Sequence, residues 1–147
     1  MRIELATNRF YLARDYSEAV EAAGGLPVHI PLIPSPDFVS GVMASLDGLL
    51  LPGSDSDVDP LRYGREPHPQ LGPVHPEKDA TDLLALAEAE ASAMPVFAIC
   101  FGLQSLNVSR GGTLIQDIVS QTPNPIKHER AFRAIEPLIA SGFWTGA

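Results

Sequence analysis

Apolar and polar positions alternate along this chain in blocks that predict strands and helices in turn. Compact apolar runs bounded by Gly or Pro are typical of buried strands, and here they cover Met1–Ala6, Leu26–Ile33, Gly48–Gly53, Pro95–Cys100 and Thr113–Ile118. Apolar residues at helical spacing predict helices over Asp15–Ala23, Phe38–Leu46, Pro76–Ala93 and Leu103–Arg110. Strands of this kind that alternate with helices favour a parallel sheet covered on both faces. We therefore predict a flavodoxin-like α/β fold, with a doubly wound and mainly parallel sheet that is incomplete at the C-terminus.

Two of the expected helices have clear signals at their ends. Asp15 and Glu18 have the spacing of a capping box at the start of the first helix. Pro76 suits the first position of the third helix, where acidic residues also complement the macrodipole. On that third helix we expect a buried stripe and an opposite, solvated acidic face. The stripe is Ala80, Leu83, Leu84, Ala87 and Ala91, and the acidic face is Asp79, Asp82, Glu88 and Glu90.

The segment from Ser54 to His75 predicts a long irregular loop, which in a compact domain is typical of a functional element. Its acidic residues match the spacing of a calcium-binding loop, namely Asp55, Asp57, Asp59 and Glu66. Pro60 stands where that loop needs glycine, so we assign the aspartates to turn formation and expect no metal. The domain extends over residues 1–121. Residues 122–147 form a divergent tail, in which Thr122-Pro123-Asn124-Pro125 breaks any regular element.

Composition excludes several classes of partner. The chain has 10 Lys and Arg against 18 Asp and Glu, a formal net charge of −8, which argues against nucleic acid or an anionic membrane surface. A single cysteine excludes an internal disulfide framework and a cysteine-based zinc site. The N-terminus lacks the apolar core of a signal peptide, and no apolar run has the length of a membrane span. We therefore expect a cytoplasmic protein.

That single cysteine, Cys100, is the first candidate for covalent chemistry. An isolated cysteine is commonly an inert buried side chain. Here, however, it ends an apolar strand, and Gly102 allows a tight turn into a helix whose N-terminus favours a thiolate. The pattern Ala98-x-Cys100-x-Gly102 has the mechanics of a nucleophile elbow, in which the N–H group of Phe101 can face an oxyanion.

Several separate motifs occur in an order that resembles a known family. They are Leu49-Leu50-Leu51-Pro52-Gly53, Asp57-Val58-Asp59-Pro60, Tyr63-Gly64, Glu66-Pro67-His68-Pro69, Ile99-Cys100-Phe101-Gly102-Leu103-Gln104-Ser105-Leu106-Asn107 and Gly111-Gly112-Thr113-Leu114-Ile115-Gln116-Asp117-Ile118. Over residues 2–121 the chain resembles the class I glutamine amidotransferase-like superfamily. Within it, the chain is most similar to the gamma-glutamyl-gamma-aminobutyrate hydrolase, or peptidase C26, branch.

The resemblance implies hydrolysis of a small γ-glutamyl substrate by a Cys-His-Glu triad, without a metal or an organic cofactor. Cys100 would be the nucleophile and would form a γ-glutamyl thioester. The oxyanion donors would be N–H groups of the turn at Gly53 and Ser54 and of Phe101, and Gln104 would lie beside the substrate. Ser54 and the aspartate after it depart from the glycine-rich turn usual in the family, so a side chain can narrow the approach to the oxyanion site.

The histidine and glutamate of the triad have no counterpart in the matched part of this chain. In the family they lie downstream, in a segment that this chain ends before reaching. His29 fits a structural role in a strand, His68 and His75 flank the loop, and His128 beside Glu129 offers only a superficial base. We expect a truncated hydrolase, which a frameshift or an early stop would explain. Its exposed sheet edge favours self-association into a homo-oligomer.

Two other functions stay open. The chain can be a degenerate, non-catalytic domain that binds a γ-glutamyl ligand or a protein partner. It can also be a thiol redox protein with the related DJ-1-like fold, in which the same elbow carries an oxidisable cysteine.

Overall fold

The computed structural model describes residues 2–4 and 9–126. The chain divides into two compact units, Met1–Asp117 and Ile118–Ala147, and the second contains the short helix α5 (Ile118–Gln121). All of the candidate chemistry described below lies in the first unit. In the described ranges, no helix combines the length and the apolar character needed to cross a membrane.

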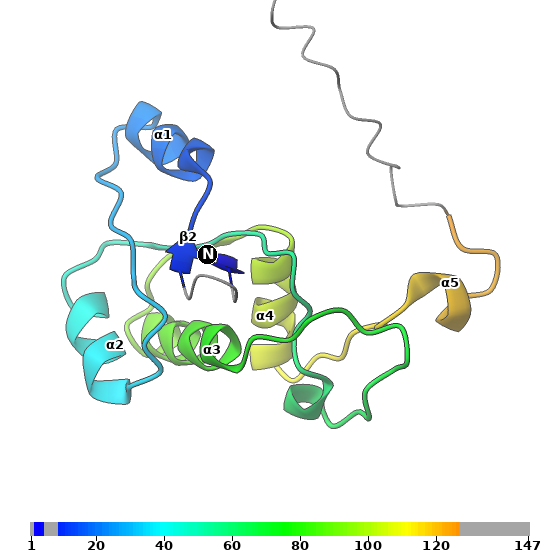
Figure 1. Cartoon of the computed structure of the whole chain (residues 1–147). Coiled ribbons are helices and arrows are strands. Elements are labelled where there is room, and N and C mark those ends of the chain that lie inside the picture. The colour runs from blue at the N-terminus through cyan, green and yellow to red at the C-terminus, as the bar shows by residue number, and fades with distance from the viewer. Residues whose placement is uncertain (1, 5–8, 127–147) are drawn as a thin grey trace, which may run out of the picture. The chain divides into compact units, whose positions relative to one another are not determined.

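A parallel pair of strands forms the centre of the first unit. Strand β3 (Leu49–Leu51) pairs with β4 (Val96–Ala98), with Leu50 opposite Phe97. Helix α3 (Pro76–Ala91) lies between the two strands in the sequence and makes the crossover that parallel strands require. The predicted α/β alternation and parallel pairing are thus confirmed for these elements (Figure 1).

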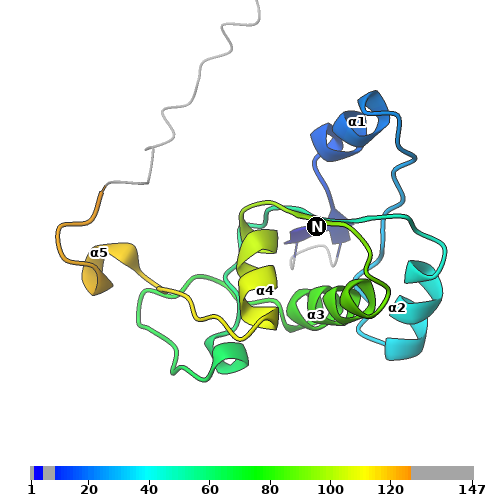
Figure 2. The ribbon, with the colours of Figure 1, turned by 180° about the vertical axis from the view of Figure 1, so that it is seen from behind.

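The main core lies between this sheet and two helices. Helix α2 (Pro36–Met43) begins at Ser35, whose hydroxyl oxygen accepts a hydrogen bond from the Phe38 N–H group at 3.4 Å. Helices α2 and α3 lie side by side in the views from both sides (Figures 1 and 2). The buried apolar residues of this cluster are Val39, Met43, Leu49, Leu51, Ala85, Leu86 and Ala89. Alternate residues of β3 therefore face the core, while Leu50 faces the other side of the sheet.

The buried face of α3 differs from the expectation. The helix buries Lys78, Asp79, Thr81, Asp82, Ala85, Leu86 and Ala89 rather than the stripe of Ala80, Leu83, Leu84, Ala87 and Ala91. Asp79 and Asp82 are therefore interior residues, and the expectation that they are solvated was wrong. Helix α3 contacts both α2 and α4 (Phe101–Ser109), so two packing partners determine the buried face. Small and apolar residues occur all round this helix, and its sequence period does not single out one face.

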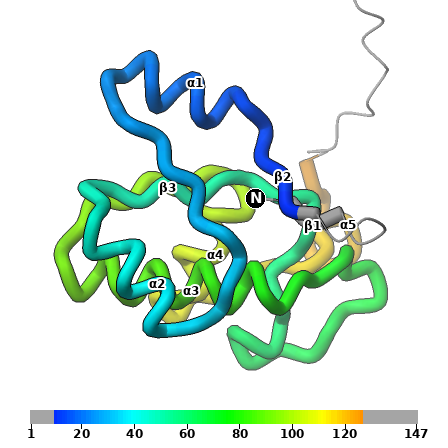
Figure 3. The backbone as a smooth tube through the Cα atoms, turned by 60° about the vertical axis from the view of Figure 1, so that its left-hand side comes forward, coloured from blue at the N-terminus to red at the C-terminus, as the bar shows by residue number. Residues whose placement is uncertain are grey.

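The N-terminal part forms a separate antiparallel pair. Strand β1 (Arg2–Glu4) falls within the expected first strand but pairs with β2 (Arg9–Tyr11), which was not expected. Helix α1 (Arg14–Ala22) follows, and Figure 3 traces the backbone from it to α2. The expected capping box is absent, because the helix begins at Arg14 and Ala13, not Asp15, is its N-cap residue. Glu18 instead accepts a hydrogen bond of 2.8 Å from Arg14 Nε.

Two expected strands are not formed. Residues 26–33 run without regular pairing, because prolines at 27 and 31 lack the N–H groups that a strand ladder needs. Residues 113–117 are also irregular, and Ile118 begins α5 rather than ending a strand. In this segment the Gln116 side chain binds the backbone of the long loop. Its Oε1 atom accepts a hydrogen bond from His68 N, and its Nε2 atom donates one to Glu66 O. The described sheets therefore contain two strands each, which agrees with an α/β fold.

Aspartate side chains organise the long loop, as expected from their turn chemistry. Asp57 Oδ2 accepts a hydrogen bond of 2.6 Å from Gly72 N, which joins the start of the loop to its end. Asp59 caps the short 3₁₀ helix η1 (Pro60–Tyr63) by accepting from Leu61 N at 3.0 Å. The loop is thus a folded element fixed at several points.

Candidate active site

Cys100 lies at the tight turn between β4 and α4, where its thiol is exposed. Its backbone has a φ of +52° and a ψ of −111°, a conformation that non-glycine residues rarely adopt. The carbonyl oxygen of Cys100 accepts hydrogen bonds from the N–H groups of Leu103 and Gln104, at 3.0 and 3.1 Å. Ile99 N donates to Leu51 O at 2.9 Å, so the residue before the cysteine is held by β3. The backbone at Cys100 therefore forms the tight strand-to-helix turn that the sequence predicts for a nucleophile elbow.

Gly102 explains why the turn needs a glycine. A Cβ atom at this position would lie 2.3 Å from Leu51 O and 2.5 Å from Leu51 Cβ. Both contacts are far closer than van der Waals distance, and Gly102 itself is buried. The absence of a side chain thus lets α4 approach β3 directly beneath Cys100.

The turn after β3 reaches the same place. A Cβ atom on Gly53 would lie 3.5 Å from Cys100 Cβ and 4.0 Å from its Sγ atom, so Gly53 packs beside the thiol. The Gly53 N–H group donates a hydrogen bond of 3.0 Å to the hydroxyl oxygen of Tyr16, from helix α1. The structure therefore brings Cys100, Phe101 and Gly53 together, as the resemblance implies, and adds Tyr16.

Sequence reasoning missed this role of Tyr16. The helical period groups Tyr16 with Ala19, Val20 and Ala23 on one face of the expected helix, which indicates no particular hydrogen bond. The only signal available was a phenol on an otherwise apolar face, because a tyrosine in such a place usually finds a polar partner.

The two remaining expected site residues are Gln104, which lies four positions after Cys100, and Ser54, which follows Gly53. Gln104 is half-buried in the first turn of α4. Ser54 is also half-buried, and its Oγ atom lies 2.8 Å from Ser56 Oγ. The Ser54 hydroxyl is thus engaged within its own loop.

Two of the described histidines have hydrogen-bond partners other than the thiol. His29 Nε2 lies 2.8 Å from Ser17 Oγ, and His68 Nδ1 accepts a hydrogen bond from Gln70 N at 3.1 Å. His75 is the residue before α3. Within the described part of the chain, no hydrogen bond joins the Cys100 thiol to a histidine. His128, the fourth histidine, lies outside the described residues.

Charged groups are buried behind the elbow. Lys78 is 1% exposed, and its Nζ atom lies 2.6 Å from Asp82 Oδ2 and 4.4 Å from the centre of the Phe101 ring. Burial raises the pKa of the Asp82 carboxyl, and the neighbouring Lys78 opposes this shift. Burial also raises the pKa of Asp79, whose Oδ2 atom accepts a hydrogen bond of 2.8 Å from Asp59 N. Among the described residues, no group of three or more His, Cys, Asp or Glu side chains could hold a metal ion.

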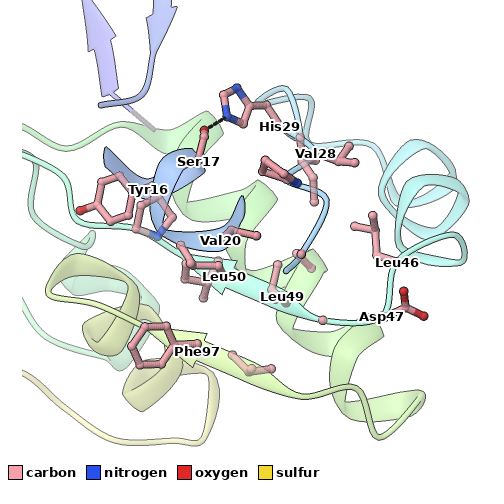
Figure 4. A pocket seen from close by; sticks show the side chains of 18 of the residues that line it. Tyr16, Ser17, Val20, Val28, His29, Leu46, Asp47, Leu49, Leu50 and Phe97 are labelled. Atoms are coloured by element: carbon pink, nitrogen blue, oxygen red, sulfur yellow. Dashed lines mark hydrogen bonds between the residues drawn. The ribbon is translucent and has the colours of Figure 1, made fainter. Parts of the chain in front are cut away.

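A cavity of about 810 Å³ lies beside the sheet, and its lining comes from α1, from the segment 25–32, from both strands and from α3. Figure 4 shows Tyr16 and Val20 of α1 on one side of it, with Leu50 and Phe97 of the two strands on the other. The lining is largely apolar, and Cys100 does not contribute to it. The candidate chemistry is therefore at the end of the strands, outside this cavity.

An exposed cysteine at a strained turn, directly after a parallel strand and before a helix, is the arrangement of α/β enzymes that carry their nucleophile on an elbow. The chain belongs to the peptidase C26 family, whose model matches residues 3–139. The resemblance found from the sequence motifs is thus confirmed.

Individual relatives agree with this assignment. The chain is 43% identical over 109 residues to "Putative glutamine amidotransferase Rv2859c" of Mycobacterium tuberculosis, a match that covers 74% of this chain and 35% of that protein. It is 36% identical over 120 residues to "Protein NtpR" of Enterococcus hirae, covering 82% and 49% of the two chains. It is 37% identical over 121 residues to "Gamma-glutamyl-gamma-aminobutyrate hydrolase PuuD" of Escherichia coli K12, covering 80% and 45%. The matched region is therefore less than half of each of these relatives.

Proposed function

We propose that this chain carries the nucleophile of a glutamine amidotransferase-like hydrolase that cleaves γ-glutamyl amides through a thioester. The exposed Cys100 thiol at the strained elbow, with Gly53 packed beside it, is the observation that carries the proposal. Membership of the peptidase C26 family supports the choice of a γ-glutamyl substrate, because one relative is named as a hydrolase of such a compound.

In the proposed reaction, the Cys100 thiolate attacks the γ-carbonyl carbon and forms a C–S bond. The carbonyl oxygen becomes an oxyanion, which accepts hydrogen bonds from the N–H groups of Phe101 and Gly53. Collapse of this intermediate breaks the C–N bond, and the amine leaves with an added proton. Water then hydrolyses the thioester to release glutamate and the free thiol. The substrate oxygen displaces the Tyr16 hydroxyl, which accepts from Gly53 N in the free protein.

Protonation of the leaving amine requires an acid, and thiol activation requires a base. We assign neither role to a described histidine. His29 and His68 form the hydrogen bonds given above, and His75 directly precedes α3. We therefore expect this chain to acylate readily with a substrate whose leaving group needs no proton, and to turn over amides slowly.

The test uses the γ-p-nitrophenyl ester of glutamate, N-acylated to prevent cyclisation. We expect a burst of p-nitrophenolate stoichiometric with protein and a γ-glutamyl adduct on the Cys100 peptide by mass spectrometry. Cys100→Ala is the matched control and should give neither. A folded wild-type chain without a burst would overturn the proposal. Calorimetric binding of a γ-glutamyl amide without acylation would instead favour the non-catalytic binding domain.

We also propose that β3 and β4 belong to a doubly wound sheet. The parallel register and the α3 crossover support this arrangement. Leu49 and Leu51 direct their backbone groups towards β4, so those of Leu50 point to the other edge. Hydrogen exchange at the Leu50 amide tests the proposal. Slow exchange in the native protein indicates a further strand at this edge, and exchange at the rate of an open strand edge would refute it.

A further inference from the structure

Lys78 is an unusual residue to find in the interior behind an active-site turn. Its side chain is 1% exposed and is among the largest fully buried side chains of the described residues. An ammonium group loses its hydration when it is buried, and an ion pair rarely compensates for this loss better than apolar side chains of the same shape. The ion pair with Asp82 therefore makes the buried charge tolerable, but stability alone does not explain why a lysine is there.

The position of the charge indicates what it contacts. The Nζ atom of Lys78 lies 2.6 Å from Asp82 Oδ2 and 4.4 Å from the centre of the Phe101 ring. A cation at this distance from an aromatic face is attracted by the ring quadrupole, and the attraction is stronger where water is excluded. Asp82, one helical turn along α3 from Lys78, fixes the direction of the ammonium group. The ring of Phe101 is itself 1% exposed.

Phe101 follows the strained residue directly. Cys100 has a φ of +52°, a conformation that persists only where the surroundings fix it. The two residues after it are both buried: Gly102 is pressed against Leu51, and Phe101 lies under the ammonium group of Lys78. Helix α3 therefore contacts the elbow through a charged side chain, Lys78, which lies over the Phe101 ring.

We propose that Lys78 is a positioning residue for Cys100: paired with Asp82, it clamps the Phe101 ring and so maintains the strained turn that presents the thiol. The clamp would also position the Phe101 N–H group for an oxyanion, and this part of the inference rests on the proposed function. The effect on the position of the thiol is independent of that function, because it can be measured without any substrate.

The experiment measures alkylation of Cys100, the only cysteine of the chain, by iodoacetamide over a range of pH. We expect Lys78→Met to lower the second-order rate constant about 3- to 10-fold. The reduction should persist at high pH, where a thiol is fully ionised. A purely electrostatic effect would disappear there, and its disappearance would overturn the positioning role. Lys78→Arg keeps a cation over the ring and should restore most of the rate.

Two further variants make the test independent of folding defects. Phe101→Leu keeps an apolar side chain but removes the ring, so it should lower the rate like Lys78→Met, and the double variant should add little. Glu90→Met alters an exposed position of the same helix and should leave the rate unchanged. Urea denaturation identifies variants that are less stable. Lower stability with an unchanged alkylation rate in both Lys78→Met and Phe101→Leu would refute the proposal. Because alkylation needs no acyl transfer, a lowered alkylation rate without any burst would reject only the proposed function.

Discussion

Replacing Gly102 by alanine sets two opposing effects against each other. Gly102 lies in the first turn of α4, and alanine in a helix is favoured over glycine by about 0.5–1 kcal/mol. The added Cβ, however, would lie 2.3 Å from the carbonyl oxygen of Leu51. That oxygen also accepts a hydrogen bond from Ile99 N, so it cannot move away without weakening the link between β3 and the elbow. Overpacking of this kind typically costs about 1–3 kcal/mol.

We therefore expect Gly102→Ala to lower the free energy of unfolding by about 1–2 kcal/mol, because the clash exceeds the gain in helix propensity. For a domain of this size that is a decrease of roughly 1 M in the urea midpoint. The assay is urea denaturation followed by far-ultraviolet circular dichroism. Alkylation of Cys100 in the same variant reports whether the displaced turn alters the exposure of the thiol.

Gly41 provides a matched control. It lies within α2, and a Cβ there would meet nothing within 4 Å. Gly41→Ala should therefore stabilise the protein by about 0.5–1 kcal/mol through helix propensity alone. If Gly102→Ala is at least as stable as the wild type while Gly41→Ala shows the expected gain, β3 and α4 can separate at little cost. The close approach of these two elements would then not define the elbow.

Three further substitutions test the surroundings of the site. Tyr16→Phe removes the acceptor for Gly53 N and should destabilise the protein by about 0.5–1.5 kcal/mol in urea denaturation, whereas an unchanged midpoint would argue against this hydrogen bond. Burial raises the pKa of Asp79 above its ordinary value of 3.8, so the folded protein holds this proton more tightly than the unfolded chain and loses that stability as pH rises through the raised pKa. Asp79→Asn keeps an oxygen for Asp59 N, and its stability relative to wild type should increase as the pH rises above about 4; equal pH dependence of the two proteins would contradict the raised pKa of Asp79. Ser105→Ala removes a buried hydroxyl that has no partner among the described residues, so the midpoint should stay the same or rise, and a loss above about 1 kcal/mol would reveal a hidden partner.

The sequence predicts those elements whose signals are local. Pro76 marks the start of α3, and an apolar run bounded by glycine and proline marks β3, whereas α2, expected from Phe38, begins at Pro36. The expected strand at residues 26–33 fails because its prolines remove backbone donors, a local signal that apolar character outweighed in the prediction. The buried face of α3 could not be predicted, since contacts with α2 and α4 determine it.

For the candidate site, too, local features could be predicted from the sequence, whereas contacts between distant segments could not. The turn at Cys100 follows from a local pattern, and the approach of Gly53 was implied by the resemblance to a family. The hydrogen bond from Gly53 to Tyr16 and the charge of Lys78 over the Phe101 ring join segments far apart in the sequence. No period or motif encodes such pairs, because they depend on how α1, α3 and α4 pack.

Three of the long-range contacts that hold the elbow come from elements that precede Cys100 in the chain. Strand β3 closes on Gly102, helix α3 places a cation over Phe101, and helix α1 provides the partner of Gly53. The geometry of the nucleophile is therefore encoded in the described residues, independently of whichever group acts as its base. Thiol presentation and amide turnover are consequently separate properties. An acylation burst without sustained amide hydrolysis would be the expected result for an elbow that has no base among the described residues, rather than evidence against the elbow.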